Sequence, residues 1–152
     1  MKSIAIFLFL AGTTVVAANA PSFAIWTSAD AKQMAQELNT RLHGGLASQP
    51  LGNMGNYTFA MTLRNQSGGV EVHEHMADIF VIESGEATLA TGGKVIDPKT
   101  TTPGEIRGTS LEGATEHRVA AGDVLTIPAG MPHQMRVAPG TQVVYMAIKV
   151  AQ

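Results

Sequence analysis

Three histidines carry the clearest chemical signal in this sequence. His73 and His75 lie two residues apart, and His133 follows much later, after a Pro-Ala-Gly-Met-Pro segment. Residues two apart in a β-strand project to the same face, so we expect His73 and His75 to point together. Neutral imidazoles bind zinc, iron, copper and nickel, and three of them leave coordination positions open for water or a substrate. The pattern therefore predicts a metal site suited to chemistry, with all three histidines as ligands.

One carboxylate is expected beside these histidines. Glu71 shares the strand parity of His73 and His75, so its side chain should project to the same side. A carboxylate in such a position can accept a proton during a reaction. Glu71 is therefore a candidate general base, and the alternative is a solvated residue at the mouth of the site. His43 and His117 have no comparable sequence context and are not predicted to be ligands.

The composition favours one compact domain that takes a small ligand. The chain has 152 residues, of which 45% are hydrophobic and 14% are charged, and its formal charge is -2. It has no basic run interleaved with aromatic residues, so nucleic acid is not an expected partner. It also has no cysteine, so any metal must be bound by His, Asp or Glu. We therefore expect a small-molecule ligand or substrate.

The beginning of the chain has the pattern of a signal peptide. Lys2 precedes an apolar run over 4–18, and small residues follow this run. We assign 1–20 to a signal peptide and leave the cleavage site open between residues 18 and 24. The protein is then expected in the periplasm or outside the cell, with no stable membrane span after cleavage. An uncleaved amino-terminal anchor is the alternative.

An amphipathic helix is predicted after the signal peptide. Four apolar residues fall on one helical stripe: Ala31, Met34, Leu38 and Leu42. We assign 26–45 to this helix and its connection to the next part of the chain.

The rest of the chain, 46–152, is assigned to a β-barrel domain. From Tyr57 onward, short alternating segments are separated by Gly, Pro, Asn and Ser, which is typical of an antiparallel sandwich or barrel. The apolar face of 57–64 is expected to point inward. The segment 78–82 is apolar at every position but the first, which implies that a helix or a partner subunit covers its second face, and a homodimer is left open. The stretch 91–116 predicts an extended hairpin or loop.

These motifs resemble those of the cupin superfamily. The second cupin motif runs Gly, five residues, Pro-x-Gly, two residues, His, three residues and Asn. Four residues of this chain match it at every spacing: Gly122, Pro128, Gly130 and His133. Val137 stands where the motif has Asn. The resemblance implies an all-β fold, a double-stranded β-helix or jelly-roll barrel, here preceded by one amino-terminal helix.

The first cupin motif is matched less closely. It runs Gly, five residues, His-x-His, three or four residues, Glu, six residues and Gly. His73, His75 and Gly85 fit it, but the carboxylate is Asp78, with only two residues between it and His75. A two-residue turn at 76–77 would place Asp78 opposite His75 on one face, so that Asp78 becomes a fourth metal ligand. Aspartate is one methylene shorter than glutamate, and three protein ligands are the alternative.

The resemblance also implies a function. Cupins bind iron, manganese, zinc, nickel or copper, and their enzymes include dioxygenases, isomerases, decarboxylases and lyases. We expect an exported single-domain cupin that binds one divalent metal ion and acts as a dioxygenase-type oxidoreductase on a small organic substrate. Two alternatives stay open: a non-catalytic cupin that binds a small molecule or a metal, and a cupin lyase or isomerase. A shared fold does not choose among them.

Overall fold

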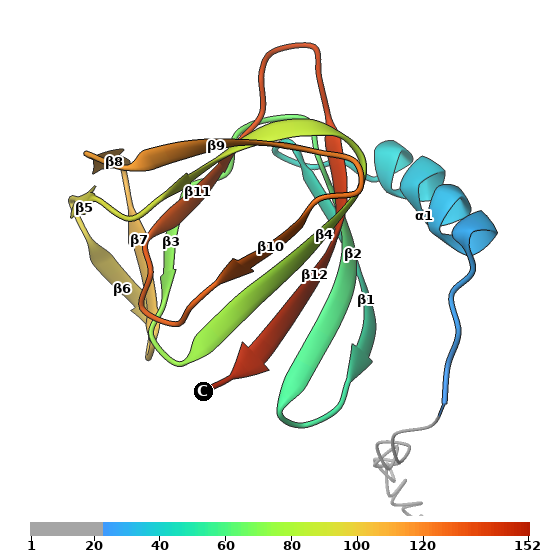
Figure 1. Cartoon of the computed structure of the whole chain (residues 1–152), viewed down its shortest axis with the longest axis horizontal. Coiled ribbons are helices and arrows are strands. Elements are labelled where there is room, and N and C mark those ends of the chain that lie inside the picture. The colour runs from blue at the N-terminus through green and yellow to red at the C-terminus, as the bar shows by residue number, and fades with distance from the viewer. Residues whose placement is uncertain (1–22) are drawn as a thin grey trace, which may run out of the picture.

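The computed structural model describes residues 23–152, which form one helix followed by a curled antiparallel sheet (Figure 1). The predicted signal peptide, 1–20, lies outside the described residues. Within the part that the structure describes, no helix has the length and apolar character needed to cross a membrane.

Strands dominate the chain after the helix, which confirms the predicted all-β class with one amino-terminal helix. The elements, in chain order, are α1 (Ser28–Thr40), β1 (Leu46–Asn53), β2 (Tyr57–Arg64), β3 (Val70–His73), β4 (Met76–Thr91), β5 (Lys94–Ile96), β6 (Lys99–Thr102), β7 (Glu105–Gly108), β8 (Ser110–Glu112), β9 (Thr115–Ala120), β10 (Val124–Ile127), β11 (His133–Arg136) and β12 (Val143–Ala151).

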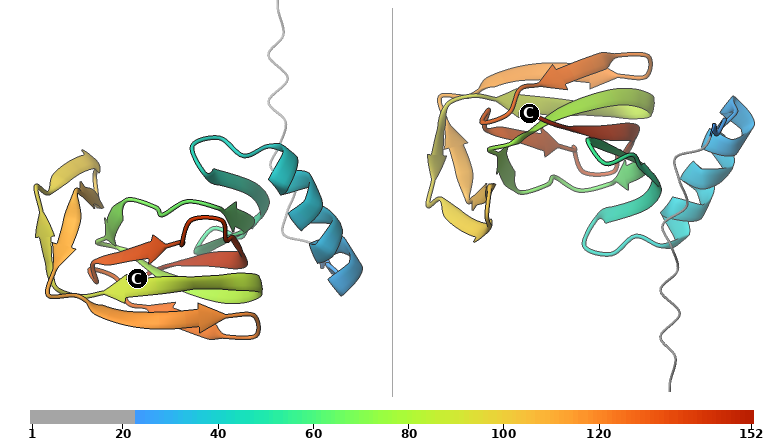
Figure 2. Two further views of the ribbon diagram at one scale, coloured as in Figure 1. Left: turned by 90° about the horizontal axis from the view of Figure 1, so that it is seen from above. Right: turned by 90° about the horizontal axis from the view of Figure 1, so that it is seen from below.

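The long strand β4 belongs to both layers of the barrel. Its first half pairs with β12 and β10, and its second half pairs with β11 and β9. Gly85 lies between the two halves with φ of 77°, and a Cβ atom there would collide with the carbonyl oxygen of Gln142. Only glycine meets both conditions. The chain can therefore pass from one layer to the other within a single strand, as the two views of Figure 2 show.

The remaining strands continue outward from β4. The order is β1-β2-β12-β4-β11-β3-β7-β6, with β9 and β10 also paired to β4. The stretch 91–116 forms two nested strand pairs, β5 with β8 and β6 with β7, so the predicted hairpin is confirmed. Because β7 also pairs with β3, this extension lies against the strand that carries His73.

An apolar cluster fills the interior of the barrel. Phe80 of β4 and Tyr145 of β12 lie at its centre, with ring centroids 5.0 Å apart. Burying side chains of this size contributes about 1.5–3 kcal/mol each. The other buried members are Ile82, Ala87, Leu89, Val119, Ile127, Met135, Val137 and Val143. Asp78 precedes Phe80 by two residues on the same strand face, so this cluster borders a buried polar region.

A second apolar cluster holds α1 against the outer face of the sheet. Met34 and Leu38 of α1 are buried against Met61 and Leu63 of β2, with Val144 of β12 beside them. The helical stripe predicted from the sequence is confirmed, because Ala31 and Leu42 also pack on this cluster. The helix begins with a capping box between Thr27 and Asp30.

The predicted orientation of 57–64 is wrong. Met61 and Leu63 face α1, whereas Arg64 faces the interior, where its Nε donates a hydrogen bond to the Tyr145 hydroxyl. Because the helix covers the outer face, both faces of β2 are covered, and the larger apolar side chains pack on the helix. The segment 78–82 is buried on its inner face and half-buried on its outer face, so a covering homodimer stays a prediction.

Candidate metal centre

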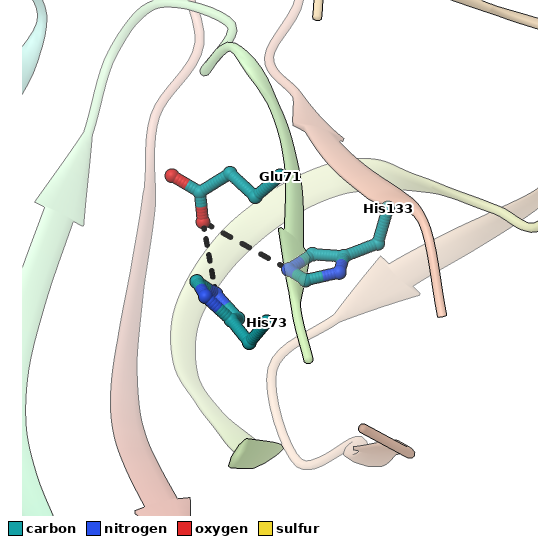
Figure 3. A group of neighbouring side chains, drawn as sticks. All are labelled: Glu71, His73 and His133. Carbon is teal, nitrogen blue, oxygen red and sulfur yellow. Dashed lines mark ion pairs between the residues drawn. The ribbon is translucent and has the colours of Figure 1, made fainter. Parts of the chain in front are cut away.

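Two histidines and two carboxylates meet inside the barrel beside the apolar cluster. The side chains of His73, Asp78 and His133 are almost completely buried, with exposed fractions of 3%, 1% and 3%. Glu71 is half-buried at the edge of the group. Ligand atoms of Glu71, His73 and His133 lie within 4.8 Å of one another, and Figure 3 shows the carboxylate directed at both imidazoles.

The pairing of β3 with its two neighbours brings these residues together. His133 of β11 lies opposite Glu71 of β3, and Glu105 of β7 lies opposite His73 of β3. Directly opposed residues on antiparallel strands project to the same face. Two cross-strand pairs therefore build this side of the site.

Hydrogen bonds fix the orientation of both imidazole rings. His73 Nδ1 lies 2.8 and 2.7 Å from the two carboxylate oxygens of Glu105, and His133 Nδ1 lies 3.0 Å from the Met131 carbonyl oxygen. These oxygens accept hydrogen bonds, so Nδ1 donates in each ring and a neutral ring directs the lone pair of Nε2 into the site. Such a partner behind the ring is typical of metal-binding histidines.

The distances among the donor atoms suit a shared metal ion. Asp78 Oδ2 lies 3.3 Å from His73 Nε2 and 3.4 Å from His133 Nε2. Glu71 Oε2 lies 3.6 and 3.8 Å from the same two nitrogens. Ligands bonded at about 2.1 Å are separated by about 3.0 Å at a right angle and by about 3.4 Å at the tetrahedral angle. The four side chains therefore fit a metal ion, and the Asp78 carboxylate lies closer to both histidine nitrogens than the Glu71 carboxylate does.

Two of these donor atoms are unsatisfied. Among the described residues, Asp78 Oδ2 and His133 Nε2 are buried with no hydrogen-bond partner. Leaving a buried polar atom unpaired costs about 1–3 kcal/mol. A cation between the two atoms would satisfy both, so the residues present fit the divalent metal ion that the cupin resemblance implies.

The charges around Glu71 keep it ionised. Burial raises its pKa, but the contact with His73 and the positive charge of Arg107 outweigh burial and lower the pKa of Glu71 to about 2. A carboxylate with such a low pKa accepts protons poorly. The surroundings of Glu71 therefore favour a metal ligand over the general base expected from the sequence.

A lysine extends into the same site from β12. Lys149 lies directly opposite Asp78 in the pairing of β12 with β4. Its Nζ is 2.7 Å from Asp78 Oδ1 and 2.8 Å from His73 Nε2. Burial opposes the ionisation of Asp78, but His133, His73 and Lys149 together hold the pKa of this carboxyl well below its usual range. Asp78 is therefore an anion with a lysine already bound to one of its oxygens.

The neighbouring carboxylates make His73 more basic than a free imidazole. Contacts with Asp78 and Glu71 raise the pKa of His73 to about 9, although burial and the charge of Lys149 act against them. The Nε2 atom of this ring is also 2.8 Å from Lys149 Nζ. Two basic groups therefore meet beside the two carboxylates.

The structure does not bring His75 into this site. Strand β3 ends at His73, and the next two residues form the turn into β4. The side chain of His75 is exposed and lies near Gly104. The prediction that His73 and His75 share a strand face is therefore wrong, because the turn lies at 74–75 and not at 76–77. Asp78, and not His75, lies beside His73.

Two residues of the site, Glu105 and Lys149, are not predicted from the sequence. Glu105 belongs to the irregular stretch 91–116, where no spacing distinguishes it. Lys149 had a signal, because it is the only charged residue of β12 and shares the inward parity of Tyr145 and Ala147. A hollow of about 480 Å³ opens beside Lys149.

Solved structures identify the fold, although no family model matches the sequence and no curated protein matches it. A predicted oxalate decarboxylase from Thermotoga maritima is similar with a TM-score of 0.53 and 18% identity, over 70% of this chain and 81% of that chain. A cupin-like protein from the same organism has a TM-score of 0.52 and 16% identity, over 71% and 70% of the two chains. The chain has the cupin fold.

The cupin fold is shared by proteins of several activities. An oxalate oxidase is similar with a TM-score of 0.52 and 16% identity. The match covers 74% of this chain and only 54% of the oxalate oxidase chain. KdgF from a Halomonas species has a TM-score of 0.51 and 11% identity, over 73% and 84% of the two chains. Identities this low establish a common fold, and the chemistry must be argued from the site.

Proposed function

We propose that this cupin binds one divalent metal ion through His73, His133 and Asp78, with Glu71 as a more distant fourth ligand. The observation that carries the proposal is the convergence of two imidazole nitrogens on one buried carboxylate oxygen, at 3.3 and 3.4 Å. Two histidines and one carboxylate with open positions are the donor set of non-haem iron(II) oxygenases. Iron(II) is therefore the first metal to test, and manganese, zinc, nickel and copper are the alternatives.

On this basis we propose a dioxygenase-type oxidoreductase that acts on a small organic substrate. A metal bound here would supply a Lewis acid and a redox centre with open coordination positions. The chain's own groups orient the ligands: Glu105 holds the ring of His73, and Arg107 Nη1 donates to Glu105 Oε2 over 3.0 Å. Phe80 and its neighbours keep one side of the site dry. The hollow beside Lys149 offers a substrate access from the other side.

The proposed place of action is the periplasm or the outside of the cell. The support for this part is the signal-peptide pattern over 1–20. Fractionation of cells that produce the full chain, followed by mass analysis of the mature amino terminus, tests it. A protein retained in the cytoplasm with an intact leader would contradict it.

Metal content of the purified protein tests the metal site. We expect about one iron(II) per chain after anaerobic loading. His133→Ala should lose this ion, whereas His75→Ala should keep it, which makes His75 a matched control only two residues from His73. Wild-type protein without stoichiometric metal, or His133→Ala with full metal, would contradict the proposal. Oxygen uptake with a panel of small organic acids and phenols then tests the dioxygenase reaction.

One observation favours a second candidate, a cupin that binds a small molecule without a metal. Lys149 already forms hydrogen bonds with both Asp78 and His73. A protein that keeps this arrangement would bind its ligand in the presence of a chelator. Thermal-shift screening with EDTA present separates the two candidates, because a metal-dependent site would show no ligand stabilisation there. A lyase or isomerase would instead convert its substrate without consuming oxygen.

A further inference from the structure

The position of Lys149 has a consequence for any metal that enters the site. Lys149 Nζ donates a hydrogen bond to Asp78 Oδ1, and the same nitrogen is 2.8 Å from His73 Nε2. Asp78 is 1% exposed, so its negative charge is shielded from water and depends on nearby cations. Among the described residues, Lys149 makes the shortest contact of a basic nitrogen with this carboxylate, at 2.7 Å from Oδ1, whereas His73 and His133 lie 3.3 and 3.4 Å from Oδ2.

Lys149 and a metal require the same atom of His73. Nδ1 of this ring donates to Glu105, so Nε2 is the nitrogen that remains for a metal. An imidazole nitrogen makes one contact in the ring plane, and the contact of 2.8 Å with Lys149 Nζ occupies this position on Nε2. The lysine does not occupy the whole set, because His133 Nε2 and Asp78 Oδ2 have no hydrogen-bond partner within residues 23–152. Competition is therefore concentrated at His73.

We infer that Lys149 is an internal cation that competes with the metal for His73 and thereby sets the metal affinity of the site. This inference rests on the proposed metal function. The metal must displace the ammonium group from His73 and then bind beside a like charge, and both effects weaken binding. In return, the lysine stabilises the metal-free protein by pairing with the buried Asp78.

An open space beside Lys149 can accept the displaced ammonium group. Its side chain is 37% exposed, and it lines the hollow of about 480 Å³ together with Asn53 and Thr58. A four-carbon stem can turn the ammonium group toward this space while the backbone of β12 stays paired with β4. Metal binding therefore needs a change of side-chain conformation and no rearrangement of strands.

Lys149→Met tests the inference, because methionine keeps most of the length and removes the charge. The control is Lys99→Met, which removes an exposed lysine of β6 far along the sheet from β12. Cobalt(II) and zinc affinities are measured by competition with a chromophoric chelator, and melting temperatures are measured with and without metal. We expect Lys149→Met to bind metal at least about tenfold more tightly. Its metal-free melting temperature should fall, while Lys99→Met should match the wild type.

Each outcome separates this inference from the proposed function. Equal or weaker metal binding by Lys149→Met, with a metal-binding wild type, overturns the inference and leaves the metal site standing. Metal binding by Lys149→Met alone supports the inference and contradicts the proposed function, because the natural chain then binds no metal. No binding by either protein overturns both. If Lys149→Met fails to fold, Lys149→Gln gives the same comparison, because its amide can still donate to Asp78 without a charge.

Discussion

The two sides of the candidate site are prepared for a cation in different ways. On β3 and β11, the imidazoles of His73 and His133 are oriented by hydrogen bonds at Nδ1, so that both Nε2 atoms face the centre. On β4 and β12, Asp78 is already paired with Lys149. One side therefore presents ligands, and the other presents a ligand with its own counter-charge. Metal affinity at this site therefore depends on the group that the metal displaces as well as on the groups that bind the metal.

Removing the charge of Asp78 should have the largest effect. Asp78→Asn is expected to weaken metal binding about 100-fold or more, because an amide oxygen is a poorer ligand and Lys149 loses its counter-charge. Chelator competition measures the affinity. Asp97→Asn is the control, since Asp97 has φ of 50° and asparagine tolerates that conformation. Unchanged affinity in Asp78→Asn would show that the site has no ligand on β4.

Changing the group behind His73 should have the next largest effect. Glu105→Gln is expected to weaken metal binding about 10-fold to 100-fold, because the amide orients the ring less strongly and makes Nε2 less basic. Glu112→Gln, on the edge strand β8, provides an exposed control. If Glu105→Gln binds metal as tightly as the wild type, the hydrogen bond behind His73 does not prepare this side of the site for a metal.

The sequence predicts one side of this site better than the other. His133 lies in a local motif in which turn residues and the ligand are close together, so spacing alone identifies it. Gly85 is also predictable, because it stands where the first cupin motif ends in Gly. The barrel and the helix follow from the alternation of apolar residues over short windows.

The rest of the site depends on where a turn begins and on pairing between distant strands. The sequence predicts His75 as a ligand on the assumption that one strand runs through both His73 and His75. The structure has a turn at 74–75, so the alternation of a strand ends at His73. Glu105 and Lys149 reach the site through the pairing of β7 with β3 and of β12 with β4. Such pairing has no local spacing, so the sequence does not place Glu105 at the site, and for Lys149 it offers only the inward parity of a lone charged residue on its strand.

Raising the pH should strengthen metal binding to a smaller degree. The pKa of His73 is raised to about 9 in the metal-free protein, so a metal must displace a proton from this ring below that pH. The raised pKa stabilises the metal-free fold below about pH 6.5, and this stabilisation is lost as the pH rises through about 9. Melting curves of both forms from pH 6 to 9.5 measure the difference. A metal-induced shift that shrinks with rising pH would contradict this prediction.

Removing His75 should have the smallest effect. His75→Ala is expected to change metal affinity by less than about twofold, because the side chain is exposed in the turn between β3 and β4. Chelator competition again measures the affinity. A large loss would mean that the turn rearranges to bring His75 to the metal, as the cupin motif implies.

The position of the metal itself is the sharpest test of the proposed site. Anomalous diffraction at the metal absorption edge, from crystals loaded with iron(II) or cobalt(II), locates the ion without relying on activity. We predict one peak at about 2.0–2.3 Å from His73 Nε2, His133 Nε2 and Asp78 Oδ2, with Lys149 turned away from His73. A peak bonded to His75 and not to Asp78, or the absence of a peak between the two buried histidines, would contradict it.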